Sequence, residues 1–142
     1  GRTNWNLSMN EQLDEIPPGA SLLGRKLISV DAAAGRVDLS FMGKAEFSNR
    51  HGTIQGGFLA AMLDATTGLA VLSALPDTET AVTLDLNVSY INAAQVGPIQ
   101  ATGTLTHRSR TIARSNGELR AEDGTVIASA TASLRIMQRQ NK

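Results

Sequence analysis

The residues best suited to chemistry in this chain lie in and just before an apolar segment that begins at a pair of glycines. Asp64 is the single ionisable residue between Gly56 and Leu75, and two polar residues, His51 and Gln55, precede the segment. An ionised carboxylate away from water is costly unless it is paired or hydrogen-bonded, and such groups are common at sites of chemistry. Asp64 is therefore either a catalytic carboxylate or a structural one, held by a cap or a salt bridge.

Small residues share the face of Asp64 when the segment is drawn at helical spacing. They are Gly57, Ala60, Ala61, Thr67 and Gly68. A tightly packed helix would fill such a face with Leu or Ile. The small side chains therefore predict a gap for another helix, for a ligand, or for both.

The two glycines predict a helix start that accepts negative charge, with a merely flexible helix entry as the alternative. Their N–H groups are exposed, and the missing side chains let a substrate approach the backbone. Eight residues separate Gly56 from Asp64, which is about 12 Å along a helix axis. Those two groups cannot act on one carbonyl within one chain. A second, antiparallel copy would bring them together, so a catalytic site here would be shared across a dimer.

Hydropathy patterns predict one long helix and six strands in a single domain. The strands are expected at 25–31, 35–41, 82–90, 98–108, 111–122 and 125–136, and the helix at about 56–75. Pro76 prevents the helix from continuing, and Asp123-Gly124 predicts the last turn. In the third strand, apolar residues from Val82 to Tyr90 alternate with polar ones and predict one apolar face.

A helix that is apolar on nearly all sides is expected to be buried on nearly all sides. One antiparallel sheet that curls around it would bury it, which is an α+β architecture. Residues 1–24 are predicted to be an N-terminal approach segment with a short helix, and residues 25–142 form the domain.

Composition favours a globular protein over other classes. Of 142 residues, 42% are hydrophobic, and thirteen basic residues balance thirteen acidic ones, which leaves no excess charge for nucleic acid or a membrane surface. The absence of cysteine excludes a thiol nucleophile and a thiolate metal site, and two histidines are too few for a histidine-rich metal site. With no run of roughly 20 apolar residues and no leader pattern, a soluble cytoplasmic protein is expected.

The motif around the glycine pair resembles that of the hotdog-fold acyl-CoA thioesterases, in particular the phenylacetate-degradation (PaaI-like) branch. In that family an Asn is followed by a Gly three residues later, by a polar residue before Gly-Gly, and by an acidic residue two helical turns further on. The matching residues are Asn49, Gly52, Gln55, Gly56, Gly57 and Asp64. The similarity covers residues 20–136 and includes the family's order of elements, with an antiparallel sheet wrapped around one long helix.

The resemblance implies hydrolysis of an acyl-CoA thioester. Asp64 would attack the thioester carbonyl or activate water, while the Gly56 N–H and the Gln55 side chain would hold the oxyanion. Asn49 would orient Gln55 or its loop. Thr83 matches a hydroxyl position that places the attacking water, with an ordinary strand threonine as the alternative.

One departure from the branch concerns the residue before Gly-Gly, which is commonly histidine there and is Gln55 here. An amide can donate a hydrogen bond to a thioester carbonyl but cannot exchange a proton near neutral pH. His51 lies outside the motif and is expected to be a loop residue or a contact at the rim of the substrate site. Arg108 and Arg110 match the region that contacts the nucleotide of coenzyme A, with solvated surface arginines as the alternative.

The expected partners are an acyl-CoA substrate and further copies of the chain, in a homodimer or homotetramer. Neither a metal nor a cofactor is expected beyond the coenzyme A of the substrate. Phe58, Met62 and Leu63 suggest apolar walls for a small aromatic or a short- to medium-chain acyl group. Two alternatives stay open, a hydratase or dehydratase of the same fold and a non-catalytic dimer that binds acyl-CoA.

Overall fold

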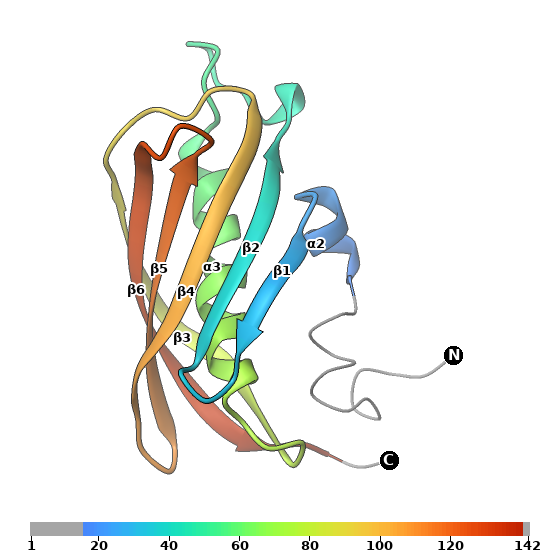
Figure 1. Cartoon of the computed structure of the whole chain (residues 1–142), viewed down its shortest axis with the longest axis vertical. Helices are drawn as coiled ribbons and strands as arrows, with labels where there is room; N and C mark the ends of the chain where they lie inside the picture. The colour runs from blue at the N-terminus through green and yellow to red at the C-terminus, as the bar shows by residue number, and fades with distance from the viewer. Residues whose placement is uncertain (1–15, 141–142) are drawn as a thin grey trace.

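The computed structural model describes residues 16–140 as one antiparallel sheet with a long helix, α3 (Gly56–Ser73), against one face (Figure 1). The strands are β1 (Lys26–Asp31), β2 (Arg36–Gly43), β3 (Glu79–Tyr90), β4 (Gly97–Arg108), β5 (Ile112–Ala121) and β6 (Val126–Gln138). They are ordered β1-β2-β4-β5-β6-β3 across the sheet, so β1 and β3 are its edges. The predicted α+β fold and order of elements are confirmed.

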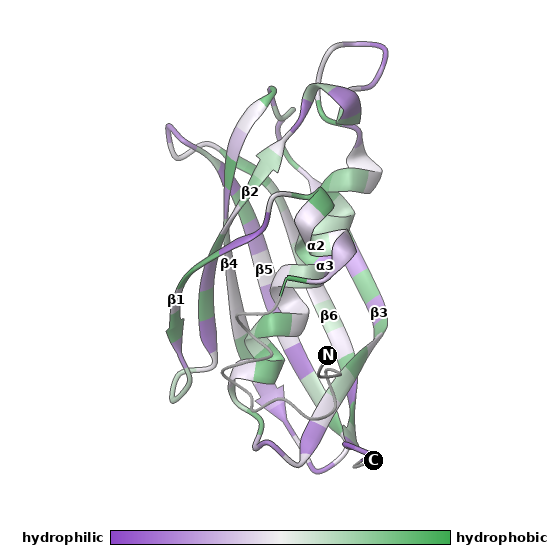
Figure 2. Cartoon of the chain, turned by 90° about the vertical axis from the view of Figure 1, so that its right-hand side faces the viewer, coloured by the Kyte–Doolittle hydropathy of each residue, from purple (hydrophilic) through white to green (hydrophobic). Residues whose placement is uncertain are grey.

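The sheet curls so that β1 and β3 lie on either side of α3 (Figure 2). Alternate residues of the inner strands are buried against the helix, as expected for a sheet with one face on a core. The largest of the fully buried side chains are those of Val37, Leu39, Phe41, Met62, Leu63, Ile99, Leu119, Ile127 and Leu134. The core therefore lies between α3 and the concave face of the sheet.

Two glycines let the helix lie directly on the sheet. Gly103 of β4 and Gly117 of β5 are directly opposite each other in the ladder. A Cβ atom on Gly103 would lie 2.5 Å from the carbonyl oxygen of Thr66, and one on Gly117 would lie 3.0 Å from Cγ2 of Thr67. The main chain at Thr66 and the methyl group of Thr67 therefore set the spacing between helix and sheet just beyond Asp64.

The prediction that the helix is buried on nearly all sides is wrong for the single chain. About half of α3 is buried, whereas Gly57, Ala61 and Asp64 are exposed. These residues belong to the predicted strip of small side chains, whereas Thr67, another member of that strip, is buried against Gly117 of β5. By length and composition α3 could also span a membrane, but its packing against the sheet is that of a core helix.

The prediction of one apolar face along the third strand also needs correction. The register of β3 against β6 shifts between Thr83 and Asp85, so Leu84 is an extra residue in the strand. A bulge of this kind exchanges the two faces of a strand. Thr83 pairs with the buried Leu134 and points to the helix, whereas Val82 pairs with Arg135 and is exposed.

The N-terminal approach segment contains α2 (Pro18–Leu22), and the 3₁₀ turn η2 (Ala45–Phe47) follows β2. Leu23, next to α2, belongs to the hydrophobic core, and its carbonyl accepts a hydrogen bond from the Met42 N–H. Residues 1–15 of the predicted approach segment, and 141–142, lie outside the described residues.

Candidate functional site

The carboxylate of Asp64 is exposed on the middle of α3 and is held from β3. The hydroxyl of Thr83 donates a hydrogen bond to its Oδ1 at 2.9 Å. Within residues 16–140, no basic side chain is ion-paired with Asp64. The alternative of a structural aspartate locked in a salt bridge therefore has no support in this part of the chain, and the second carboxylate oxygen is left open for chemistry.

The start of α3 offers unused hydrogen-bond donors. Gln55 is the N-cap residue, yet its side chain makes no capping hydrogen bond and is exposed. The N–H groups of Gly56 and Gly57 have no acceptor among residues 16–140, as expected for a first helical turn. That turn carries no acidic residue that would neutralise the positive end of the helix dipole. A substrate oxygen that gains negative charge is the ligand that this end favours.

The loop before the helix is organised by Asn49. Its Oδ1 accepts hydrogen bonds from the His51 N–H at 2.9 Å and the Thr53 N–H at 3.3 Å, and its Nδ2 donates to Thr53 Oγ1 at 3.1 Å. The Gln55 N–H donates to the carbonyl of buried Phe47 at 2.8 Å. Of the two roles expected for Asn49, the structure therefore shows it shaping the loop and shows no hydrogen bond from it to the Gln55 side chain. His51 is exposed on this loop.

Tyr90, the last residue of β3, is a contact of the helix start that the sequence interpretation missed. Its hydroxyl donates to the Gly56 carbonyl at 2.8 Å. It also lines an open recess of about 250 Å³ together with Ile54, Leu59 and Ile91. The available signal was an aromatic residue at the end of the strand that follows the helix, and the sequence interpretation counted it only as an apolar position.

The arginines expected near coenzyme A lie far from the start of α3 in the single chain. The connection between β4 and β5, which carries Arg110, is at the opposite end of the molecule from the loop before α3 (Figure 1). Arg108 forms an ion pair with Glu79 at 2.7 Å, and Arg110 is exposed. One chain alone therefore does not bring these arginines to Gln55 and Gly56.

Of the three residues that suggested apolar acyl walls, Met62 and Leu63 are fully buried in the core. Phe58 is half-buried, and its ring stacks on that of Phe47 with centroids 4.3 Å apart. In the single chain, Phe58 alone among the three has surface to offer an acyl group.

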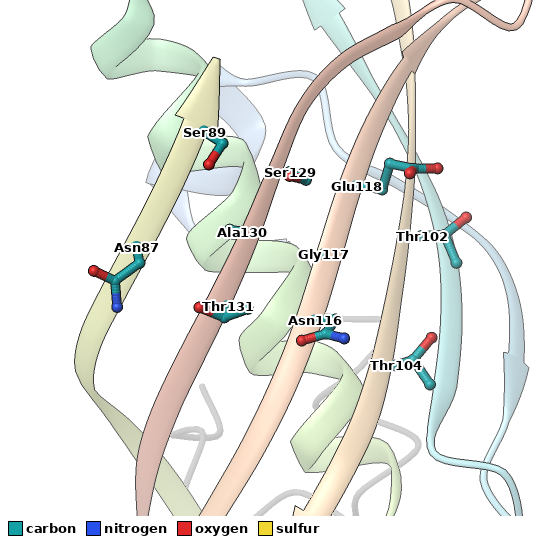
Figure 3. A pocket seen from close by; sticks show the side chains of 10 residues that line it. All are labelled: Asn87, Ser89, Thr102, Thr104, Asn116, Gly117, Glu118, Ser129, Ala130 and Thr131. Atoms are coloured by element: carbon teal, nitrogen blue, oxygen red, sulfur yellow. The ribbon is translucent and has the colours of Figure 1, made fainter. Parts of the chain in front are cut away.

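A hollow of about 420 Å³ lies on the other side of the sheet and takes no part in this site. Figure 3 shows its polar side chains on β3, β4, β5 and β6, with α3 behind the sheet. Its lining includes Asn87, Thr102, Asn116 and Thr131, but none of the predicted catalytic or substrate-binding residues. The candidate chemistry is therefore confined to the helix side of the sheet.

The arrangement consists of two half-sites in each chain. One is a carboxylate with a hydroxyl partner, Asp64 and Thr83. The other is a set of donors at the helix start, Gln55 and Gly56, eight residues or about 12 Å earlier in α3. Either half can perform one part of acyl transfer, and neither reaches the other within the chain.

The chain is similar in sequence and fold to several known proteins. A model of the family described as Thioesterase superfamily matches residues 51–128, more than half of the chain. The crystal structure of a phenylacetic acid degradation-related protein from Ralstonia eutropha JMP134 has a TM-score of 0.85 and 33% identity, and covers 91% of this chain and 99% of that one.

Two further matches concern coenzyme A by name. Acyl-coenzyme A thioesterase 13 of Mus musculus is 24% identical over 119 residues, 79% of this chain and 84% of that protein. A Streptococcus mutans UA159 protein bound to acetyl CoA shares the fold, with a TM-score of 0.74, 20% identity, and coverage of 82% of this chain and 91% of that one. Together these similarities confirm the hotdog fold and the resemblance to the PaaI-like branch.

Proposed function

Because the chain belongs to the thioesterase superfamily and is a thioester hydrolase, we propose that it hydrolyses acyl-CoA thioesters at a site shared by two copies of the chain. The observation that carries this proposal is the separation of the two half-sites along α3. Asp64 is exposed and has no ion pair with a basic side chain in the described part of the chain, and the donors at Gly56 lie eight residues away. A second copy is the simplest source of the missing half.

In the proposed reaction the thioester carbonyl of the substrate lies against the helix start of one chain. The Gly56 N–H and the Gln55 side-chain amide donate to the carbonyl oxygen and stabilise the negative charge that develops on it. Asp64 of the other chain either attacks the carbonyl carbon or removes a proton from the attacking water. In the direct route the carbon–sulfur bond breaks to release the coenzyme A thiolate and leaves an anhydride between the acyl group and Asp64, which water then hydrolyses to the free acid and the restored carboxylate. In the general-base route the water oxygen bonds to the carbonyl carbon as the carbon–sulfur bond breaks, and the proton taken by Asp64 passes to the thiolate.

Thr83 keeps Asp64 in place for either route. Its hydrogen bond occupies Oδ1, so Oδ2 faces the substrate or the water. A single turnover in ¹⁸O-labelled water identifies a direct attack if the label appears in Asp64, because only water that opens an anhydride at the aspartyl carbonyl places it there. The general-base route places the label only in the acid product.

The edge strand β3 supports the pairing of two copies. It is twelve residues long, and Val82, Leu84 and Tyr90 are exposed on it, a combination that invites another strand. Thr83 binds Asp64 near the middle of β3, and Tyr90 binds Gly56 at its last residue. Antiparallel pairing of β3 with its copy would therefore bring Gly56 of each chain towards Asp64 of its partner. Association of such dimers into a tetramer stays a prediction.

The same pairing gives the arginines a role. Arg108 and Arg110 lie at the end of the chain that would approach the partner's helix start, where coenzyme A phosphates could reach them. Arg108 would then exchange its contact with Glu79 for a phosphate. His51 would lie at the rim, and Gly57, which has open space around it, would let the substrate approach.

The proposed acyl group is a small aromatic or a short- to medium-chain one, with Phe58 as the apolar surface that it meets. No metal and no resident cofactor take part in the proposed reaction. The expected cytoplasmic location stays a prediction.

The decisive experiment is thiol release from a panel of acyl-CoA thioesters by the purified chain and its Asp64→Asn variant. We expect hydrolysis by the unaltered chain and a loss of at least about a hundredfold in the variant, with acyl-CoA binding retained. Absence of hydrolysis across the panel, or an Asp64→Asn variant with unaltered turnover, would contradict the proposal. Hydration of an enoyl-CoA without hydrolysis would favour the hydratase alternative.

A further inference from the structure

The helix start is contacted twice by one side chain of the edge strand. The Tyr90 hydroxyl donates to the Gly56 carbonyl at 2.8 Å. The ring also occupies the place of a side chain at position 56, because a Cβ atom there would lie 3.0 Å from Cζ and 3.2 Å from Cε1. Tyr90 thus fixes Gly56 through its carbonyl and against its α-carbon.

A helix that begins with two glycines has a flexible first turn, and a contact from outside the helix can fix it. Glycine has the greatest backbone freedom of all residues, and within residues 16–140 no atom beyond the adjoining helix backbone lies within 4 Å of where the Cβ of Gly57 would be. Catalysis by N–H donors requires them to point at the developing oxyanion before the reaction begins. Without an external contact, the Gly56 N–H, which is the proposed oxyanion donor, and the Gly57 N–H beside it would be poorly fixed.

The hydrogen bonds around the two glycines reach both peptide planes. The Gln55 carbonyl, in the plane that carries the Gly56 N–H, accepts hydrogen bonds from the Phe58 and Leu59 N–H groups. The Gly56 carbonyl, in the plane that carries the Gly57 N–H, accepts the Tyr90 hydroxyl. Hydrogen bonds in series polarise one another, so the Tyr90 bond also strengthens the Gly57 N–H as a donor.

Tyr90 is itself well anchored in the sheet without being a core residue. It pairs with Ala128 of β6, and the next two N–H groups, those of Ile91 and Asn92, both donate to the Ile127 carbonyl. Its side chain is nevertheless 55% exposed. A residue held this way contributes little by burial, so the hydroxyl contact with Gly56 stands out as its specific interaction.

We propose that Tyr90 is a positioning residue for the oxyanion donors at the start of α3. The inference rests on the proposed thioesterase reaction and assigns Tyr90 no contact with the reacting atoms. With Thr83 held to Asp64 and Tyr90 held to Gly56, β3 connects to both half-sites. The edge strand β3 then positions both groups of the site, the Asp64 carboxylate and the donors at the start of α3.

The test compares Tyr90→Phe, which removes only the hydroxyl, with Ser89→Ala on the opposite face of the same strand. For acyl-CoA hydrolysis we expect kcat to fall about tenfold in Tyr90→Phe with KM within about twofold, because a fixed donor acts mainly in the transition state. Ser89→Ala should keep both constants. The carbonyl stretch of a thioester bound to Asp64→Asn should move closer to its value in water when Tyr90→Phe is added.

A second measurement does not depend on activity. Amide hydrogen exchange at Phe58 and Leu59, whose N–H groups donate to the Gln55 carbonyl, should be at least about threefold faster in Tyr90→Phe than in the unaltered chain, while exchange in the middle of α3 stays the same. Unaltered exchange at Phe58 and Leu59 would overturn the proposal whatever the activity. Faster exchange with unaltered kcat would overturn its link to catalysis. Absence of hydrolysis by the unaltered chain would instead contradict the proposed function, and the exchange result would still decide whether Tyr90 fixes the helix start.

Discussion

The Thr83 hydroxyl donates to Asp64 Oδ1 at 2.9 Å because β3 bulges at the following residue, Leu84. Beyond the bulge, Leu86 pairs with Ala132 and faces the helix, and regular alternation from there would turn Thr83 to the outer face. The extra residue turns Thr83 inward instead. A local irregularity of the sheet thus supplies the partner of the candidate catalytic carboxylate.

Replacement of Thr83 tests this contact. Thr83→Val keeps the shape but removes the donor, and we expect kcat for acyl-CoA hydrolysis to fall about tenfold, the value of a hydrogen bond to a charged group. Thr83→Ser keeps a hydroxyl and should retain most of the activity. Steady-state kinetics of both variants check the prediction, and equal activities would contradict it.

The shared site predicts complementation between two inactive chains. In a heterodimer of Asp64→Asn with Gln55→Ala, one site combines the intact Asp64 of one chain with the intact Gln55 of the other. We expect each heterodimer to recover about half the activity of the unaltered dimer, since one of its two sites is complete. Tandem affinity purification with two tags would isolate the heterodimer for the assay. Recovery no greater than that of the parent variants would show that each chain carries its own site.

A charge on the edge strand should separate the copies. Leu84 is 56% exposed on β3, and Leu84→Glu would place a carboxylate at the proposed pairing edge. We expect a monomer by light scattering and loss of hydrolysis, with secondary structure retained. Ile28→Glu is the matched control, since Ile28 is 63% exposed on the opposite edge strand β1. If only the Ile28→Glu variant were a monomer, the interface would lie on β1, which would contradict pairing through β3.

The close contact between α3 and Gly103 of β4 predicts that adding one methyl group at position 103 destabilises the fold. A Cβ on Gly103 would lie 2.5 Å from the Thr66 carbonyl oxygen, so α3 would have to move. We expect Gly103→Ala to lower the free energy of unfolding by about 1–3 kcal/mol. Gly19→Ala, with no atom within 4 Å of the new Cβ, should not destabilise the chain. Urea denaturation of the two variants provides the comparison.

Asp38 predicts a pH-dependent contribution to stability. Burial alone would raise the pKa of Asp38, but hydrogen bonds from Arg36, Thr102 and Ser29 and the charge of Arg36 outweigh burial and hold the pKa below its ordinary value. A lowered folded-state pKa stabilises the protein above the unfolded-state value, and this stabilisation is lost as the pH falls through the folded-state pKa.

The difference in unfolding free energy between the unaltered chain and Asp38→Asn should therefore be largest near neutral pH. It should shrink as the pH falls from about 5 towards about 2. Urea denaturation across this range measures it, and a difference that grows in acid would contradict the assigned cause.

The sequence predicted the fold closely because its signals are local and periodic. Pro76 limits the helix, and Gly124 with a positive φ of 91° forms the predicted last turn, where Asp123 accepts a hydrogen bond from the Thr125 N–H. The spacing between Gly56 and Asp64 likewise gave the separation of the half-sites, since helical rise depends on residue count alone.

The remaining features depend on contacts between distant segments, which periodicity does not encode. The alternation from Val82 to Tyr90 has no break at Leu84, so the bulge is visible only in the register with β6. The contact of Tyr90 with Gly56 joins positions 34 residues apart. The exposure of Asp64 could not be predicted either, because apolar composition does not say which side of a helix the sheet covers.

The meeting of α3 with Gly103 and Gly117 has a consequence for how relatives of this chain can differ. The Thr66 carbonyl oxygen faces Gly103 and the Thr67 methyl group faces Gly117, so the height of Asp64 above the sheet depends on one main-chain contact and a few small groups rather than on large core side chains. Surface residues such as Phe58 can then be exchanged to accept other acyl groups while the carboxylate stays at a constant position. The residue that carries the chemistry, Asp64, and a residue that selects the acyl group, Phe58, can therefore change independently although both lie on α3.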